Sequence, residues 1–152
     1  MPLNHTTPSQ SIFLVQTDTT VGFLSQNAAR LETVKARPAG KQFLKVFYDL
    51  KHYKASGGRV PDRHKAAARR AKKTTFIVKN QAFRIVTEPL HRHFLQPYGW
   101  MYSTSANQSG QTFERAFCEA NADIIVEDFR GFCECAASSI VRLGRVKRSR
   151  LR

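Results

Sequence analysis

The sequence has few acidic residues and no long apolar run. Its 152 residues include 11 Asp and Glu against 25 Lys and Arg, so the formal net charge is +14. The longest apolar run near the start, 12–15, falls far short of the ~20 residues that a membrane helix needs. The N-terminus also lacks the basic stretch followed by an apolar stretch that marks a secretory signal. We therefore expect a cytoplasmic protein with no membrane partner.

Cysteine is scarce as well. Cys118, Cys133 and Cys135 make an odd number, which argues against a disulfide framework. The pair Cys133-x-Cys135 could join His91-x-His93 in a metal site, but structural zinc sites have wider ligand pairs and four clear ligands. We interpret the cysteines as ordinary thiols and the histidines as surface residues. No metal bound by protein side chains is expected.

The chain does contain enough apolar material for one core. Hydrophobic residues make up 41%, including eleven Phe, which excludes disorder throughout. Apolar and β-branched runs predict strands at 12–16, 43–47, 74–78, 82–86, 100–104, 124–126 and 139–143. Helices are predicted between them, at 27–34, 48–53, after 61, at 89–95 and at 113–120. This alternation predicts an α/β fold in a single domain. We expect residues 1–10 to be a flexible lead-in, 11–143 the domain and 144–152 a basic, mobile tail.

The positive charge is concentrated in two clusters. One comprises Arg59, Arg63, Lys65, Arg69, Arg70, Lys72 and Lys73, and the other comprises Arg142, Arg145, Lys147, Arg148, Arg150 and Arg152. Six of the acids lie in 114–134. Such an imbalance favours polyanionic partners and salt-sensitive binding. We predict that RNA binds to Arg59, Arg63, Arg69, Arg70, Lys72 and Lys73.

Three polar motifs stand out, and together they favour a phosphate site. They are Thr17-Asp18-Thr19 with Gly22, Lys35-Ala36-Arg37-Pro38, and Ser103-Thr104-Ser105-Ala106-Asn107 with Ser109-Gly110. Each alone is typical of an ordinary turn, helix end or loop. Lys35 and Arg37, however, offer the point charge and planar fork that suit phosphate oxygens. Ser105 and Asn107 would project from the same side of extended backbone. No P-loop and no dinucleotide-binding fingerprint is present.

The motifs, in this order, resemble those of the YrdC family. Residues 16–23 resemble its P-T-D-T-V-Y-G-L, 34–38 its I-K-x-R-P, 83–86 its V-R-V-P, 103–110 its S-T-S-A-N-x-S-G and 138–141 its S-T-I-V. The resemblance covers nearly the whole chain, from Ile12 to Leu143. The chain departs from the family at Val21, where the family has tyrosine, and at Ala71-Lys72-Lys73, where it has Pro-Gly-Pro.

The resemblance implies an open, twisted, mixed sheet flanked by helices. It also implies a nucleotidyltransferase that makes L-threonylcarbamoyl-AMP and pyrophosphate from ATP with Mg²⁺, L-threonine and bicarbonate. The product serves N6-threonylcarbamoyladenosine formation at adenosine-37 of tRNA. By matched position, the resemblance implies that Lys35, Arg37, Ser105 and Asn107 act in catalysis and bind ATP with Ser109. It implies that Thr17, Arg84, Ser103 and Ser138 bind threonine.

The departures from the motifs leave alternatives open. The enzyme could be weak, or the chain could be a non-catalytic YrdC-like protein that binds double-stranded RNA or tRNA, as family members bind double-stranded RNA. A lesser alternative is a maturation or assembly factor with the same fold. The macromolecular partners implied are tRNA or double-stranded RNA and the machinery that transfers the threonylcarbamoyl group to tRNA.

Overall fold

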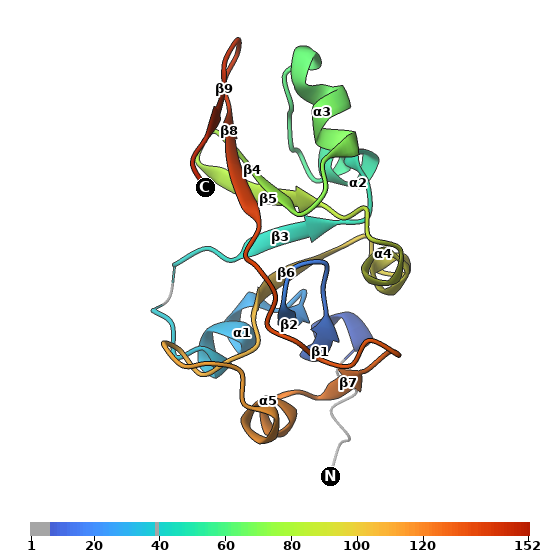
Figure 1. Ribbon diagram of the computed structural model, residues 1–152, viewed down its shortest axis with the longest axis vertical. Coiled ribbons are helices and arrows are strands. Elements are labelled where there is room, and N and C mark those ends of the chain that lie inside the picture. Colours follow the sequence, from blue (N-terminus) through green and yellow to red (C-terminus); the bar gives the residue numbers. More distant parts are fainter. Residues whose placement is uncertain (1–6, 39) are drawn as a thin grey trace. The chain divides into compact units, whose positions relative to one another are not determined.

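The computed structural model describes residues 7–38 and 40–152, which form two compact units (Figure 1). The first unit contains the described residues up to Phe43 together with Tyr102–Glu134, and the second contains Leu44–Met101 with Cys135–Arg152. Each unit has a mixed sheet accompanied by helices, which confirms the predicted α/β fold. Of the predicted lead-in, residues 1–6 lie outside the described chain and Pro8–Gln10 forms a 3₁₀ helix, η1. No helix in the described residues is long and apolar enough to cross a bilayer.

The sheet of the first unit has the strand order β7-β1-β2-β6. Strand β1 (Phe13–Gln16) runs antiparallel to β2 (Val21–Ser25) and parallel to β7 (Ile124–Val126). Strand β2 is antiparallel to the part of β6 (Trp100–Ser105) that begins at Tyr102. Because β1 and β2 are buried along their whole length, they read as continuous apolar runs rather than as alternating patterns.

Two helices, α1 (Ala28–Val34) and α5 (Arg115–Asn121), belong to the first unit. The side chain of Asn27 accepts a hydrogen bond from the Arg30 N–H at 3.2 Å and so caps α1. Leu31 of α1 and Cys118 of α5 are both fully buried. They pack in one core with strand residues Leu14 and Phe23. The packing of α1 against β1 therefore fixes the position of the residues that follow Val34.

The sheet of the second unit has the strand order β3-β5-β4-β8-β9. Its strands are β3 (Leu44–Phe47), β4 (Thr74–Val78), β5 (Gln81–Ile85), β8 (Ser139–Leu143) and β9 (Arg148–Arg150). The pairs β3–β5 and β4–β8 are parallel, whereas β4–β5 and β8–β9 are antiparallel. The turn between β4 and β5 lies at Lys79-Asn80, where both residues have positive φ as a tight hairpin requires.

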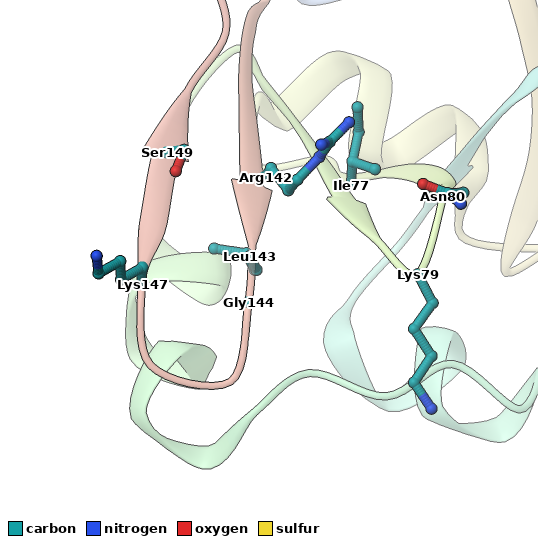
Figure 2. A pocket seen from close by; sticks show the side chains of 8 residues that line it. All are labelled: Ile77, Lys79, Asn80, Arg142, Leu143, Gly144, Lys147 and Ser149. Carbon is teal, nitrogen blue, oxygen red and sulfur yellow. The ribbon is translucent and has the colours of Figure 1, made fainter.

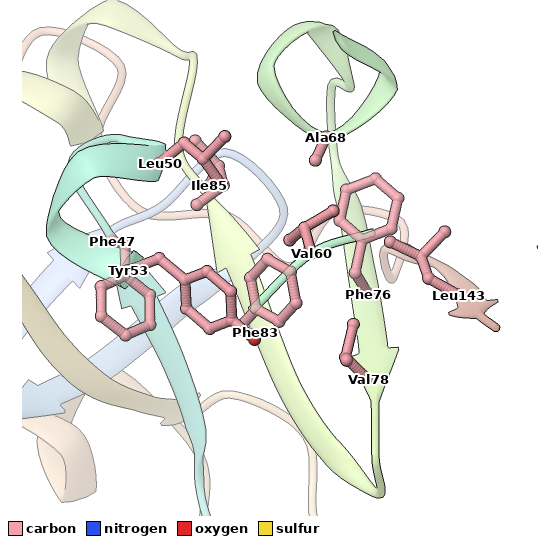
Figure 3. Close-up of a cluster of buried hydrophobic side chains, with 10 residues drawn as sticks. All are labelled: Phe47, Leu50, Tyr53, Val60, Ala68, Phe76, Val78, Phe83, Ile85 and Leu143. Atoms are coloured by element: carbon pink, nitrogen blue, oxygen red, sulfur yellow. The ribbon is translucent and has the colours of Figure 1, made fainter. Parts of the chain in front are cut away.

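The helical segments of the second unit are α2 (Leu50–Ala55), η2 (Asp62–His64), α3 (Lys65–Arg70) and α4 (Pro89–Leu95). An aromatic core lies at the centre of this unit (Figure 3). The Tyr53 and Phe83 rings stack with centroids 3.9 Å apart, and Phe47 meets Tyr53 edge to face at 5.3 Å. Ala68 of α3 and Leu143 of β8 pack against the same core. Residues 144–152, expected as a mobile tail, include β9, which returns antiparallel along β8.

Replacing Asp123 by asparagine should destabilise the first unit by about 1 kcal/mol, because one hydrogen bond to a charged group is lost at a half-exposed site. An Asp123 carboxylate oxygen accepts from the Ile12 N–H at 2.7 Å, and Arg30 donates to both oxygens. The hydrogen bond from Arg30 holds the pKa of Asp123 below its ordinary value of 3.8. The wild-type advantage should therefore be complete above pH 3.8 and disappear as the pH falls through the folded-state pKa. Urea unfolding of both proteins between pH 7 and about pH 2.5 measures this; an unchanged difference would contradict it.

Candidate functional site

Lys35 lies at the C-terminal end of α1, and its side chain links this end of the helix to the end of β6 by hydrogen bonds. Lys35 is 4% exposed, and its ammonium donates to the Ser105 carbonyl at 3.0 Å, the Asn107 carbonyl at 2.8 Å and Asn107 Oδ1 at 2.6 Å. These three bonds use all three N–H donors of an ammonium. The structure thus brings the Lys-x-Arg and Ser-x-Asn motifs together, although about seventy residues separate them along the chain.

The loop that follows β6 is held by its own side chains. Ser105 Oγ donates to Asn107 Oδ1 at 2.8 Å, and Asn107 Nδ2 donates to the Gln111 carbonyl at 2.5 Å. Ser109 Oγ donates to the carbonyl of Lys35 at 3.0 Å, which adds a second link between the loop and the end of α1. The Asn107 amide is therefore fixed in orientation, while Ser105 is exposed at the surface of the loop.

Arg37 differs from Lys35 in that its charged group is available. Ala36 has φ +46°, in the left-handed region in which helices commonly end. Arg37 is half-buried, and its guanidinium lies 4.6 Å from the centroid of the Phe43 ring. Within the described residues the guanidinium has no hydrogen-bond or ion-pair partner. A guanidinium stacked on a ring keeps its N–H edge free for an anion.

The two cations make this corner of the first unit electropositive. Burial lowers the pKa of the Lys35 ammonium below its ordinary value of 10.5, and the nearby positive charge of Arg37 lowers it further. Two cations that disfavour each other's charge form a site that an anion would stabilise. The geometry accordingly suits a phosphate group at Arg37, in the positive field of Lys35.

The Thr17 hydroxyl forms its hydrogen bonds within its own turn. It donates to the Thr20 carbonyl at 2.6 Å and accepts from the N–H groups of Thr19 and Thr20, both at 3.2 Å. Thr17 therefore shapes the turn between β1 and β2. Gly22 lets this turn lie close to β6, since a Cβ at that position would approach the Thr104 carbonyl oxygen to 3.1 Å.

A segment to which the sequence reasoning gave no role, 128–133, packs against the same turn. The Val21 N–H donates to the Cys133 carbonyl at 3.0 Å, and the Cys133 N–H donates to Gln16 Oε1 at 2.8 Å. Arg130 donates to the Gln16 carbonyl at 3.3 Å. Gln16 is 3% exposed, and a glutamine that ends an apolar strand was the one sequence signal for this contact. Val21, which replaces the family tyrosine, is buried.

The cysteines differ from expectation. Cys133 and Cys135 are disulfide-bonded, and Cys118 is a free, buried thiol. The interpretation of all three as ordinary thiols was therefore wrong, because an odd number of cysteines does not exclude one local pair. His91, expected at the surface, is fully buried. No group of three His, Cys, Asp or Glu side chains that could hold a metal occurs in the part of the chain that the structure describes.

The four residues predicted to bind threonine belong to both units. Thr17 and the half-buried Ser103 are in the first, and Arg84 and Ser138 are in the second. Arg84 is 6% exposed and donates to Thr75 Oγ1 at 3.3 Å, and Thr75 Oγ1 lies 2.8 Å from Ser138 Oγ. The structure thus joins Arg84 to Ser138 through Thr75, which the sequence reasoning missed.

The residues predicted to bind RNA all belong to the second unit. They are Arg59, Arg63, Arg69, Arg70, Lys72 and Lys73, and all six are exposed. They lie on η2, on α3 and in the segments that flank these helices.

No family model and no curated protein matches the sequence. Solved structures do match. The crystal structure of P. abyssi Sua5 complexed with L-threonine has a TM-score of 0.76 and 15% identity over 94% of this chain and 50% of that chain. E. coli YciO has a TM-score of 0.71 and 17% identity over 94% and 82%. T. kodakarensis HypF has a TM-score of 0.73 and 18% identity over 94% and 22%. The chain thus spans about half the length of the Sua5 chain. It has the YrdC-like fold.

Proposed function

We propose that this chain of YrdC-like fold is an L-threonylcarbamoyladenylate synthase, which makes threonylcarbamoyl-AMP and pyrophosphate from ATP, L-threonine and bicarbonate. One observation carries the proposal. Lys35 Nζ lies 2.6 Å from Asn107 Oδ1, so the cationic motif after α1 and the hydroxyl–amide motif after β6 form one corner of the first unit. Polyanion binding alone does not require this buried arrangement. The similarity to P. abyssi Sua5 supports the choice of substrate.

ATP would bind through its phosphates at this corner. Arg37 would present its guanidinium to the phosphate oxygens, and the exposed Ser105 would offer its hydroxyl to the same phosphates. Lys35 would hold the loop and supply positive potential, and Asn107 and Ser109 would keep that loop in place. Mg²⁺ would enter as the ATP complex, since magnesium is commonly held by substrate phosphates with few protein ligands.

Threonine would be recognised mainly by its carboxylate. Arg84 is buried and donates to the hydroxyl of Thr75, which in turn is hydrogen-bonded to the hydroxyl of Ser138. A buried guanidinium pairs strongly with a carboxylate because both are removed from water. We also propose Thr17 and Ser103 as threonine-binding residues.

The reaction follows from positioning and charge neutralisation. The threonine amine adds to carbon dioxide derived from bicarbonate and loses a proton, which gives a carbamate. A carbamate oxygen attacks the α-phosphorus, a P–O bond forms, and the bond from that phosphorus to pyrophosphate breaks. Arg37 and Lys35 would stabilise the negative charge that moves onto the leaving pyrophosphate. The product would then pass to the machinery that modifies tRNA.

The test is pyrophosphate release by the purified chain with ATP, Mg²⁺ and bicarbonate, with and without L-threonine. We expect release only when threonine is present and a product with the mass of threonylcarbamoyl-AMP. L-alanine, which lacks the hydroxyl, serves as the control substrate. Release that does not depend on threonine, or no release at all, would reject the proposal.

A further inference from the structure

The proposed synthase leaves one motif of the sequence, Cys133-x-Cys135, without a role. Cys133 and Cys135 form a disulfide, and both lie in an exposed stretch, 133–137. The disulfide closes a very short loop, because only Glu134 separates the two cysteines. The stabilisation that a disulfide provides by restricting the unfolded chain is smallest for the shortest loops. This disulfide therefore contributes little as a structural cross-link.

The stretch around the two cysteines is open to small molecules. Residues 131–138 form neither a helix nor a strand. Thiol–disulfide exchange requires that a thiolate reach one of the two sulfur atoms, and exposed disulfides are the labile ones. The third cysteine, Cys118, is fully buried in α5, and burial raises the pKa of its thiol. Exposure thus separates the reactive pair from Cys118, which has the character of an inert core thiol.

The backbone of Cys133 is bound to the turn between β1 and β2. Its N–H donates to Gln16 Oε1 at 2.8 Å, and its carbonyl accepts from the Val21 N–H at 3.0 Å. The Glu134 carboxylate accepts from the Phe113 N–H. None of these hydrogen bonds involves sulfur, so reduction of the disulfide leaves every donor and acceptor in place. Reduction loosens only the stretch of chain that carries them.

We propose that Cys133 and Cys135 form a reversible exchange site for thiol reductants, and that its oxidised form orders the turn between β1 and β2. A thiolate of the reductant attacks one sulfur of the pair, a mixed disulfide forms, and the other cysteine leaves as a thiolate and takes up a proton. A second thiolate attacks the mixed disulfide and releases the first cysteine. Two reductant thiols are thereby oxidised to one disulfide, while the protein disulfide is reduced to two thiols.

The spacing of the pair favours closure as well as opening. After reduction Cys135 remains two residues from Cys133, so each thiol acts at a high effective concentration on the other. A reactive cysteine beside a resolving cysteine is the usual arrangement of a redox-sensitive site. Closure restricts the backbone that carries the acceptor of the Val21 N–H, and Val21 is the first residue of β2. This inference does not depend on the synthase activity.

The first test treats the folded chain with excess reduced glutathione, then with iodoacetamide, and locates the labels by mass spectrometry. We expect labels at Cys133 and Cys135 and none at the buried Cys118. Oxidised glutathione should then restore the closed, unlabelled pair. Structural disulfides resist reduction by glutathione. A pair that stays closed until urea unfolds the protein, or that does not close again, would overturn the proposal.

A matched control moves the same spacing to the C-terminal hairpin of β8 and β9. It combines Cys133→Ser and Cys135→Ser with Lys147→Cys and Ser149→Cys, at two exposed positions that Figure 2 shows on one arm of the hairpin. Paired, extended backbone holds side chains two residues apart at about 6 to 7 Å, whereas a disulfide needs Cβ atoms about 4 Å apart. We expect oxidised glutathione to form adducts there without closing a ring. Closure as complete as that of the native pair would overturn the proposal, because the spacing alone would then suffice.

Hydrogen exchange at Val21 tests the effect on the turn. We expect its amide to exchange about 10-fold faster in the reduced chain than in the oxidised chain, the factor that corresponds to freeing the backbone of about one residue. Cys133→Ser with Cys135→Ser should show the fast rate with or without glutathione, and the amides of β5 should keep their rates. Equal rates at Val21 in both redox states, or faster exchange in β5 as well, would overturn the assigned effect on the turn.

Discussion

Replacing Arg37 by alanine is expected to lower threonine-dependent pyrophosphate release by about 100-fold or more, because a preorganised donor to transition-state charge contributes about 3 kcal/mol or more. The guanidinium lies over the Phe43 ring and has no other polar partner in the described chain. Its loss should leave the folded structure intact, so the melting temperature should stay within about 2 °C. Steady-state kinetics with varied ATP and a thermal melt measure the two effects separately.

Lys41→Ala is the matched control for Arg37→Ala. It removes one positive charge from an exposed position in the same unit and should leave pyrophosphate release unchanged. Arg37→Lys should recover part of the activity, since it restores the charge but not the planar fork. If Arg37→Ala retains full activity, or if Lys41→Ala loses as much, the proposed phosphate site is wrong.

Replacing Lys35 by alanine is expected to cost about 3 kcal/mol of unfolding free energy and to abolish activity. The substitution leaves three acceptors, two carbonyls and the Asn107 side-chain oxygen, without their donor. Because these hydrogen bonds order the loop after β6, stability and activity should be lost together. Arg37→Ala, in contrast, should lose activity without losing stability. Urea unfolding with intrinsic fluorescence provides the measurement. A stable but inactive Lys35→Ala protein would show that Lys35 contacts substrate instead of holding the loop.

Lys35→Met keeps the length of the side chain and isolates its charge. The folded-state pKa of Lys35 lies below the ordinary value of 10.5, mainly through burial. Between the folded-state pKa and 10.5, the unfolded chain binds more protons than the folded one, so Lys35 makes stability rise with pH. The wild type should therefore gain stability relative to Lys35→Met as the pH rises through this interval. A constant difference between the two proteins would contradict this.

The α/β fold was predictable because its strands are short, apolar and bounded by turns. The strands around Leu14, Phe76 and Phe83 and the helix that begins after Asn27 all occur where the sequence predicts them. The return strand β9 was not predictable, since Arg-Ser-Arg has no apolar face and forms a strand only because the fixed strand β8 lies beside it. Here tertiary context outweighs local propensity.

The composition of the candidate site was easier to predict than its geometry. The sequence predicts that Lys35 and Arg37 both bind phosphate, but the structure buries Lys35 and leaves Arg37 only half-buried. The sequence also gave no sign of Thr75, because a threonine inside a β-branched strand looks like an ordinary strand residue until its hydroxyl is seen beside Arg84. Such roles depend on which faces of neighbouring strands meet, and a single sequence does not encode this in any local pattern.

The position of β9 at the outer end of its sheet has a consequence for the behaviour of the protein in concentrated solution. A terminal strand exposes a row of backbone N–H and C=O groups to which a strand of another molecule can add, and long cationic side chains on that strand oppose such addition. Arg148 and Arg150 are exposed on β9, next to the exposed apolar side chains of Val146 and Leu151. The same arginines that add to the positive charge of the hairpin thus also protect the chain against edge-to-edge aggregation.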